Sequence, residues 1–193
     1  MEELKKVIFL DEEFREVDSI QEVQNYNAGI DTLYYESESE GGCAITGISR
    51  RYIVVPESYE YNEFIDEVEV VKFYENMFID RLSRECSEMI EEGFEYNGEH
   101  FSYDMKDQSN FNEQLMLLTL DEDDEEVEWK TRDNGYKTFS RDEFIAICKQ
   151  GKKRKTYLKK GLDIMRNNIN QMTKVEDLFK VQDFKTELDK IKQ

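Results

Sequence analysis

The sequence has little of the residue types on which most catalytic and metal sites are built. It contains a single histidine, His100, so any dyad, triad or histidine-containing metal site would depend on that one residue. The three cysteines, Cys43, Cys86 and Cys148, are far apart and have no metal-ligand spacing. A phosphate-binding glycine-rich loop and a nucleophile elbow are also missing. We therefore expect no enzymatic activity, no cofactor, no metal site and no small-molecule substrate.

Long apolar runs are missing as well. No stretch approaches the roughly 20 apolar residues needed to cross a bilayer. The charged amino terminus, with Glu2, Glu3, Lys5 and Lys6, leaves no room for the apolar segment of a signal peptide. An odd number of cysteines fits a reducing compartment in which the thiols are small core residues. The sequence predicts synthesis in the cytoplasm and no membrane partner.

Positive charge is scarce, and most of it lies late in the chain. The net charge is -19, but residues 141–193 contain 14 Lys and Arg against 8 Asp and Glu, a net +6. The first 140 residues are therefore at -25. This acidity makes nucleic acid an unlikely partner, because phosphate binding needs an extensive basic surface. The polarity favours attraction to other copies or to charged neighbours, and two simply solvated surfaces are the alternative.

The first 58 residues are predicted to form a small, mainly β module. Short runs of β-branched and aromatic residues alternate with acidic or glycine-rich turns, and the only proline, Pro56, ends the last run. The expected elements are strands over residues 4–10, 32–35 and 43–55, the last interrupted at Gly47, a turn at residues 40–42 and a short helix over residues 19–25.

A long amphipathic helix is predicted over residues 63–92. Its apolar residues recur at steps of three and four, and charged residues occupy the other faces. Nearly thirty residues without glycine or proline would extend roughly 40 Å. The exposed half of such a helix could contact another chain; an ordinary core helix, broken near Val70, is the alternative. The stripe comprises Phe64, Val68, Val71, Phe78, Leu82, Cys86 and Met89.

Aromatic residues alternate on both sides of Asn97-Gly98. Both turn residues tolerate the positive φ angles of a tight primed turn, which makes this the clearest hairpin signal in the chain. The sequence predicts that Phe94 and Tyr96 lie on one strand and Phe101 and Tyr103 on the other.

The region after this hairpin alternates helix and strand signals. Residues 108–120 are predicted as a short helix that runs into an extended segment. The six consecutive carboxylates at residues 121–126 repel one another and favour an exposed loop. A second hairpin is expected from strands over residues 127–130 and 136–139 around the Asn134-Gly135 turn.

Two capping boxes mark the helices that follow. Ser140 with Glu143 predicts the start of a helix that continues through Ile169, with Gly151 and Gly161 as weak points. Thr173 with Glu176 predicts a second, short helix carrying Leu178 and Phe179. The last residues are predicted to be a polar tail.

The order and spacing of these features over residues 84–180 resemble a known family. It is the small C-terminal domain of unknown function found in tail-fibre and baseplate proteins of tailed bacteriophages. The family has no assigned enzymatic activity, so the resemblance implies a virion context and no chemistry. The residues that carry the resemblance are Ile90, Gly93, Phe94, Gly98, Phe101, Ser102, Gln108, Asn110, Phe111, Trp129, Asp133, Gly135, Phe144, Gly161, Leu162, Ile169, Thr173 and Leu178.

The predicted fold class is α+β. A small β-rich module over residues 1–58 is followed by the long connecting helix over residues 59–92. Residues 93–182 form the phage-tail-associated α+β domain, with two β-hairpins and two to three helices. The polar tail covers residues 183–193.

The predicted function is that of a structural component of a tailed-phage virion, located in the tail, baseplate or fibre. It would assemble non-covalently with other phage structural proteins and with copies of itself. A tail-fibre assembly chaperone that does not stay in the particle is the first alternative, and an acidic regulatory or inhibitory protein that mimics nucleic acid is the second. Aromatic enrichment and charge nominate candidate interaction residues, for which a core role or a solvated surface remains open. These candidates are Phe78, Leu82, Tyr96, Phe101, Tyr103, Gln108, Phe111, Trp129, Lys152, Lys153, Arg154 and Lys155.

Overall fold

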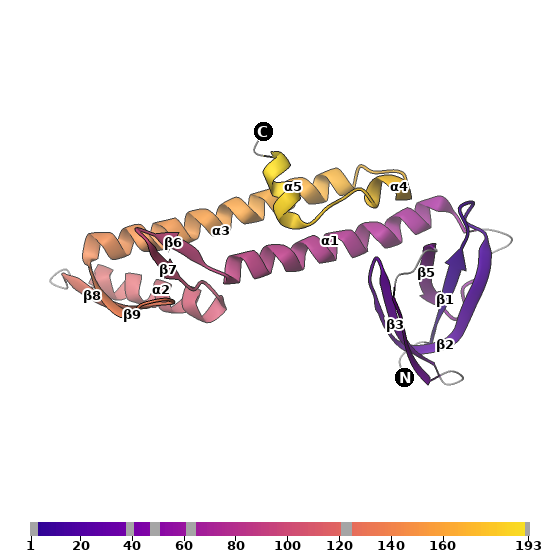
Figure 1. Cartoon of the computed structure of the whole chain (residues 1–193), viewed down its shortest axis with the longest axis horizontal. Helices are drawn as coiled ribbons and strands as arrows, with labels where there is room; N and C mark the ends of the chain where they lie inside the picture. The colour runs from indigo at the N-terminus through magenta and orange to yellow at the C-terminus, as the bar shows by residue number, and fades with distance from the viewer. Residues whose placement is uncertain (1–3, 38–40, 47–50, 61–64, 121–124, 192–193) are drawn as a thin grey trace. The chain divides into compact units, whose positions relative to one another are not determined.

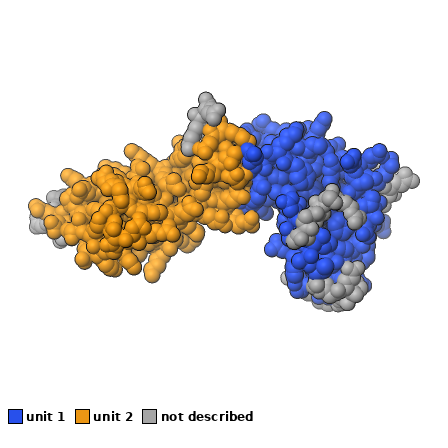
Figure 2. All heavy atoms as spheres, in the orientation of Figure 1, with its two compact units in different colours: residues 1–81, 166–182 blue, residues 82–165, 183–193 orange. Residues whose placement is uncertain are grey.

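The computed structural model describes residues 4–37, 41–46, 51–60, 65–120 and 125–191, and Figure 1 shows the order of their helices and strands. The fold class is α+β, as predicted. The chain forms two compact units: unit 1 contains residues 1–81 and 166–182, and unit 2 contains residues 82–165 and 183–193 (Figure 2). The division falls inside the two longest helices, α1 (Glu67–Glu91) and α3 (Arg141–Ile169).

Unit 1 is built on a five-stranded antiparallel sheet with the order β4-β3-β2-β1-β5. The predicted strands near residues 4–10 and 32–35 are confirmed. The buried face is filled by apolar side chains, against which Phe73 and Met77 of α1 pack. The strands are β1 (Lys5–Leu10), β2 (Glu16–Ala28), β3 (Thr32–Ser37), β4 (Gly41–Thr46) and β5 (Arg51–Pro56).

The helix predicted over residues 19–25 is wrong, because these residues lie within β2. A bulge explains the error. Val23 pairs with Lys5 and Ile20 with Val7, so three steps on β2 match two on β1, and Glu22 has a φ of 55°. The extra residue turns Ile20 and Val23 to the same buried face at a spacing of three, which imitates a helical period.

The single strand predicted over residues 43–55 is also wrong. It is two strands at opposite edges of the sheet, with β4 paired to β3 and β5 paired to β1. Gly41 and Gly42 belong to β4 and pair with β3, so the turn predicted at residues 40–42 does not include them. Residue 40 and the interruption at Gly47 lie outside the described residues. β5 ends at Pro56 as predicted.

The long predicted helix is confirmed as α1, without a break at Val70, which is fully buried. Of the predicted residues 63–92, residues 63 and 64 lie outside the described residues, and residues 65, 66 and 92 lie outside the helix. In unit 1, Phe179 contacts this helix, with ring centroids 5.1 Å from Tyr74 and 5.9 Å from Phe78. The residue follows α4 (Val175–Leu178), a single helical turn.

The capping box predicted at Thr173 is wrong. The N-cap of α4 is Lys174, which makes no side-chain capping hydrogen bond. Burial of Val175 and Leu178 fixes where the turn begins, and the Glu176 carboxylate forms an ion pair with Arg51 instead.

Unit 2 contains both predicted hairpins, but Tyr103, predicted on the second strand of the first hairpin, lies beyond the end of that strand. The first consists of β6 (Phe94–Tyr96) and β7 (Glu99–Phe101), and Asn97 and Gly98 have the positive φ angles, 49° and 79°, that the turn requires. The second consists of β8 (Glu126–Thr131) and β9 (Gly135–Ser140). Between the hairpins, α2 (Met105–Leu120) stays helical to its end, so the predicted extended segment is wrong.

The predicted start of α3 is confirmed. Ser140 N donates to Glu143 Oε2 at 2.9 Å and Glu143 N donates to Ser140 Oγ at 3.4 Å, the two reciprocal hydrogen bonds of a capping box. Of the acidic run, residues 121–124 lie outside the described residues; Glu125 is exposed and Glu126 already belongs to β8.

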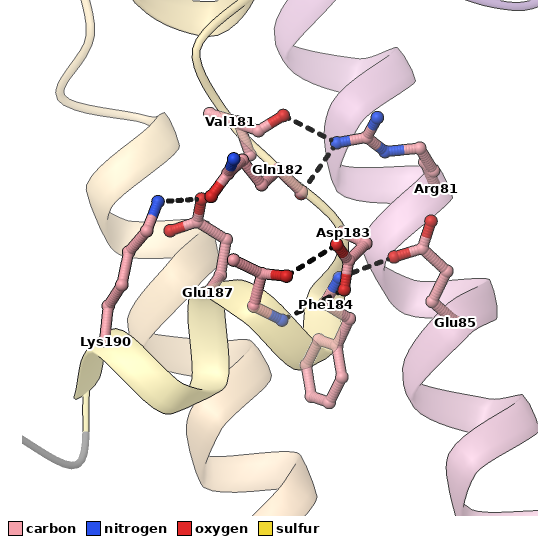
Figure 3. A network of polar contacts seen from close by, with 9 residues as sticks. Arg81, Glu85, Val181, Gln182, Asp183, Phe184, Glu187 and Lys190 are labelled. Atoms are coloured by element: carbon pink, nitrogen blue, oxygen red, sulfur yellow. Dashed lines mark hydrogen bonds and ion pairs between the residues drawn. The ribbon is translucent and has the colours of Figure 1, made fainter.

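The predicted polar tail is a helix, α5 (Phe184–Ile191), with Phe184 and Leu188 buried. The Leu188 side chain packs on Gly161 of α3, where an added Cβ would lie 2.4 Å from Leu188 Cδ1. At its start, Phe184 N donates to Glu85 Oε2 at 2.6 Å, and Asp183 Oδ1 accepts from Thr186 N at 3.0 Å (Figure 3). The tail is therefore part of the folded unit 2.

Just before this helix, Arg81 binds the backbone of the C-terminal segment in unit 1. One guanidinium nitrogen, Nη2, donates to the carbonyl oxygens of Val181 and Gln182, both at 2.9 Å (Figure 3). A guanidinium shared by two carbonyls holds the backbone more firmly than a single neutral hydrogen bond.

Candidate interaction surface

Four of the predicted interaction residues are core residues. Phe78, Leu82, Phe101 and Phe111 are at most 2% exposed. Phe78 lies in unit 1, and the other three lie in unit 2. These side chains are not accessible to a partner in the folded chain. They have the core role that was the alternative to an interaction role.

Three aromatic candidates, Tyr96, Tyr103 and Trp129, are half-buried around the core of unit 2. The Trp129 ring stacks on Phe111 with centroids 4.4 Å apart at 28°. The Tyr103 ring meets Phe94 edge-on at 5.4 Å. Aromatic residues are enriched in both cores and interfaces, which is why the sequence alone did not separate the two roles.

Gln108 and two of the basic candidates connect elements within unit 2. The Gln108 amide donates from Nε2 to Tyr103 O at 2.8 Å and accepts at Oε1 from Lys155 Nζ at 2.5 Å. Arg154 Nη2 donates to Met89 O, the last part of α1, at 3.2 Å. These side chains already make hydrogen bonds within unit 2, so they are poorly placed to bind another molecule.

The remaining candidates, Lys152 and Lys153, belong to an exposed basic face of α3. Residues at steps of three and four along a helix share one side, and here they line an open hollow of about 480 Å³. Tyr157 lies in this set and is 43% exposed. We call this the basic face; it consists of Lys149, Lys152, Lys153, Thr156, Tyr157 and Lys160.

A second hollow, of about 330 Å³, adjoins the basic face. Lys153 and Tyr157 line both hollows, and the second adds Gln150 and Arg154 of α3 together with Phe94 and Glu95 of β6. Tyr157 therefore lines two hollows, and the charged side chains around it are mainly cationic.

Sequence reasoning missed an exposed apolar surface at the end of α2. Met116, Leu117 and Leu120 are 60%, 55% and 77% exposed. We call these three residues the α2 apolar end. The available signal was that residues 115–120 are apolar on every side of the helix except at Thr119, more than one core-facing stripe can bury. Of its neighbours, only Leu118 is fully buried.

Carboxylates follow the α2 apolar end along the chain. Glu125, Glu126 and Glu128 are exposed in the structure. They continue the acidic run that the sequence places immediately after Leu120. Unit 2 therefore has an apolar surface with acidic neighbours and, on another helix, a basic surface with an aromatic centre.

The single histidine and the cysteines have ordinary environments. The His100 ring nitrogen Nε2 lies 2.8 Å from Glu92 O. Cys86 and Cys148 are buried, as predicted, and burial raises the pKa of the Cys148 thiol to about 12. The same prediction is wrong for Cys43, because its strand β4 is an exposed edge of the sheet.

The described residues also lack two other kinds of feature. They contain no group of three or more His, Cys, Asp or Glu side chains arranged to hold a metal ion. Within the same residues, no helix has the length and apolar character needed to span a bilayer.

The fold and this surface define an α+β protein with an uncharacterised domain. The chain belongs to the family described as Domain of unknown function (DUF4376), which it matches over residues 76–177. Neither the curated proteins nor the solved structures contain a match to the chain. The resemblance predicted over residues 84–180 is confirmed as an uncharacterised domain, and its association with phage tails stays a prediction.

Proposed function

We propose that this protein is a structural component of a tailed-phage virion and that it assembles non-covalently in the tail apparatus. The observation that supports this most is the order of residues over 84–180 that resembles domains of tail-fibre and baseplate proteins. The family match over residues 76–177 covers nearly the same part of the chain. Neighbouring phage proteins and further copies of this chain are the proposed partners.

The surface of unit 2 supports a role in assembly. Contiguous exposed apolar side chains on a folded protein mark interaction sites more often than chance, and the α2 apolar end is such a group. The basic face adds charge around an exposed tyrosine, a residue type enriched at the centre of interfaces.

In the proposed mechanism, apolar burial and charge have separate roles. Removing the α2 apolar end from water supplies binding free energy without fixing a direction. The lysines of the basic face and the acidic surfaces of the chain steer partners and fix their orientation.

Mass spectrometry of purified particles from the phage that encodes this chain tests the proposal. We expect its peptides in the particles at a constant ratio to known tail proteins through successive density-gradient steps. A cytoplasmic phage enzyme from the same lysate is the negative control, and it should fall away with purification.

A deletion of the gene extends the test. The proposal expects particles with an incomplete tail that purified protein restores when added. If the chain is absent from wild-type particles, it is not a virion component. Fibre-less particles in that case would support the chaperone alternative.

A further inference from the structure

We propose that the α2 apolar end of one copy docks on the basic face of α3 of a second copy, so that copies associate head to tail. This inference rests on the proposed function, which it deepens by naming a partner and the two surfaces that meet.

The basic face combines lysine ammonium groups with an aromatic side chain at its centre. Within the described part of the chain, no hydrogen bond or ion pair occupies the ammonium groups of Lys149, Lys152, Lys153 and Lys160. Like charges along one side of a helix repel, and carboxylates from a partner relieve that repulsion. Tyr157 lies among these lysines, is 43% exposed and lines both hollows. It can contact an apolar partner while the lysines contact an acidic rim.

The α2 apolar end has the complementary pattern. Its three apolar side chains are more than half exposed, and the carboxylates of Glu125, Glu126 and Glu128 follow it. An apolar centre with an acidic margin matches an aromatic centre with a basic margin. Charged residues at the margin of an interface mainly set orientation and association rate, and burial at its centre supplies affinity.

The contact must join two chains. Both surfaces remain exposed within one copy, so neither covers the other in the folded chain. Because the two surfaces differ, a pair keeps one free basic face on one copy and one free α2 apolar end on the other. Such a heterologous contact continues into a ring or a filament and does not stop at a dimer.

A second copy fits the basic face better than nucleic acid does. The first 140 residues carry a net charge of -25, which repels a polyanion from the rest of the chain. Every copy carries the same acidic region, so a second copy is always an acidic partner.

The experiment measures the mass of the full-length protein in solution by sedimentation velocity at low and high salt. We expect species larger than a dimer at 50 mM salt and about tenfold weaker association at 500 mM, because screening removes the charge steering. Variant one, K152E/K153E/K160E, reverses the basic face, and variant two, L117S/L120S, removes most of the α2 apolar end. Each is expected to be a monomer on its own.

Mixing the two variants gives the sharpest outcome. Variant one keeps an intact α2 apolar end and variant two keeps an intact basic face, so the mixture should form a one-to-one heterodimer that cannot extend. Its formation also shows that both variants are folded. A symmetric contact between like surfaces cannot produce this result.

The matched control is K130E/K159E/K185E. These lysines are exposed and lie outside the basic face, so the change in net charge equals that of variant one. The control should associate like the wild type. The inference is overturned if the wild type stays monomeric at every concentration, if the control dissociates as much as variant one, or if the mixture stays monomeric. Particle mass spectrometry is independent of these results and separates a failure here from a failure of the proposed function.

Discussion

The two units use aromatic side chains in different ways. In unit 1, buried tyrosines make hydrogen bonds to the backbone: the Tyr52 hydroxyl donates to Gly29 O at 2.5 Å, and the Tyr74 hydroxyl accepts from Tyr52 N at 3.1 Å. Rings contact rings in both units, but the pairs around Tyr52 and Tyr74 in unit 1 are tilted or edge-on, whereas in unit 2 the Phe111 ring is stacked on both Trp129 and Phe144. The difference follows from the sheets that each unit contains.

The five-stranded sheet of unit 1 has an edge strand whose backbone donors need partners. Among the described strands β5 pairs only with β1, and Tyr74 of α1 satisfies the amide of Tyr52 on that edge. The hairpins of unit 2 are separate two-stranded sheets that are marginal in isolation, so ring packing against helices has to stabilise them. The stability of unit 1 should therefore depend on the ionisation of its buried tyrosine hydroxyls. The stability of unit 2 should depend on the shapes of the side chains that pack in its core.

The largest expected loss of stability follows from a change of side-chain shape in unit 2. Gly93 has a φ of 92°, and a Cβ added there would lie 1.9 Å from Phe101 O. Backbone cannot move away as a flexible side chain can, so Gly93→Ala should destabilise unit 2 by about 4 kcal/mol or more. Thermal unfolding followed by fluorescence of Trp129, the only tryptophan, measures this loss.

Gly98→Ala is the matched control for that variant. Gly98 has a φ of 79°, but an added Cβ meets nothing within 4 Å. Only the left-handed backbone penalty of about 1–2 kcal/mol should remain. Equal losses in the two variants would mean that the close approach to Phe101 does not matter.

The next effect tests the ring packing of unit 2. Phe111→Ala removes a 2% exposed ring that stacks on Trp129, and should cost about 3–4 kcal/mol and shift the tryptophan emission to longer wavelength. Phe9→Ala removes a ring from the core of unit 1 and should leave the emission of the folded protein unchanged. A similar shift in both variants would contradict separate aromatic cores.

Alkaline pH should weaken unit 1 through its tyrosines. Burial raises the pKa of Tyr74 to about 12 from its ordinary value of 10, against smaller lowering effects of Tyr52 and Arg51. The folded state then holds the proton more tightly than the unfolded state. The stability linked to this group is complete below pH 10 and is lost as pH rises from 10 to 12, a total of about 2–3 kcal/mol.

Urea unfolding between pH 8 and 11.5 measures this loss, and Tyr74→Phe separates it from other groups. The variant should cost about 1 kcal/mol at neutral pH, where it loses the hydrogen bond to Tyr52 N, and should lose less with rising pH than the wild type does. Cys148 of unit 2 and Tyr59 of unit 1 also have raised pKa values and titrate in both proteins. Tyr74 contributes to the raised pKa of Tyr52, so the difference between the two curves reports Tyr74 together with its effect on Tyr52. Parallel pH curves would show that Tyr74 does not contribute.

The smallest effect compares the two capping boxes that the sequence predicted, one in each unit. Ser140→Ala removes the formed box at α3 and should cost about 1 kcal/mol. Thr173→Ala changes a residue that does not cap α4, so the free energy of unfolding should stay within about 0.5 kcal/mol. Urea unfolding at pH 7 checks both, and a loss of 1 kcal/mol at Thr173 would indicate a cap that the structure lacks.

Local signals predicted much of the fold because they depend on few neighbours. Asn97-Gly98 determines its own turn through backbone φ angles, and Ser140 with Glu143 caps a helix with no help from distant residues. The failures depended on distant contacts. β2 is a strand because it pairs with β1 on one side and β3 on the other. The tail predicted to be polar is helix α5, whose Leu188 packs on Gly161 of α3.

The candidate surface was harder to predict than the fold. Composition selected Phe101 and Phe111, which are core, because an aromatic side chain has the same signal in either role. It selected the lysines of α3 as a group, but the group divides only when α3 packs: Lys155 turns to Gln108, and Lys152 and Lys153 stay exposed. Leu117 and Leu120 each look like core residues, and only the run of apolar residues on nearly every side of the helix indicated that some of them would be exposed.

The position of Cys43 gives the molecule a natural point of chemical attachment. It is the one exposed thiol of three, on edge strand β4, and the two others are buried. A maleimide dye or a spin label added to the unmodified protein should therefore react once, at the rim of the sheet in unit 1. Burial also keeps the Cys148 thiol protonated at neutral pH, which slows any second reaction. Distances from that rim to other sites become measurable without replacing a single native cysteine.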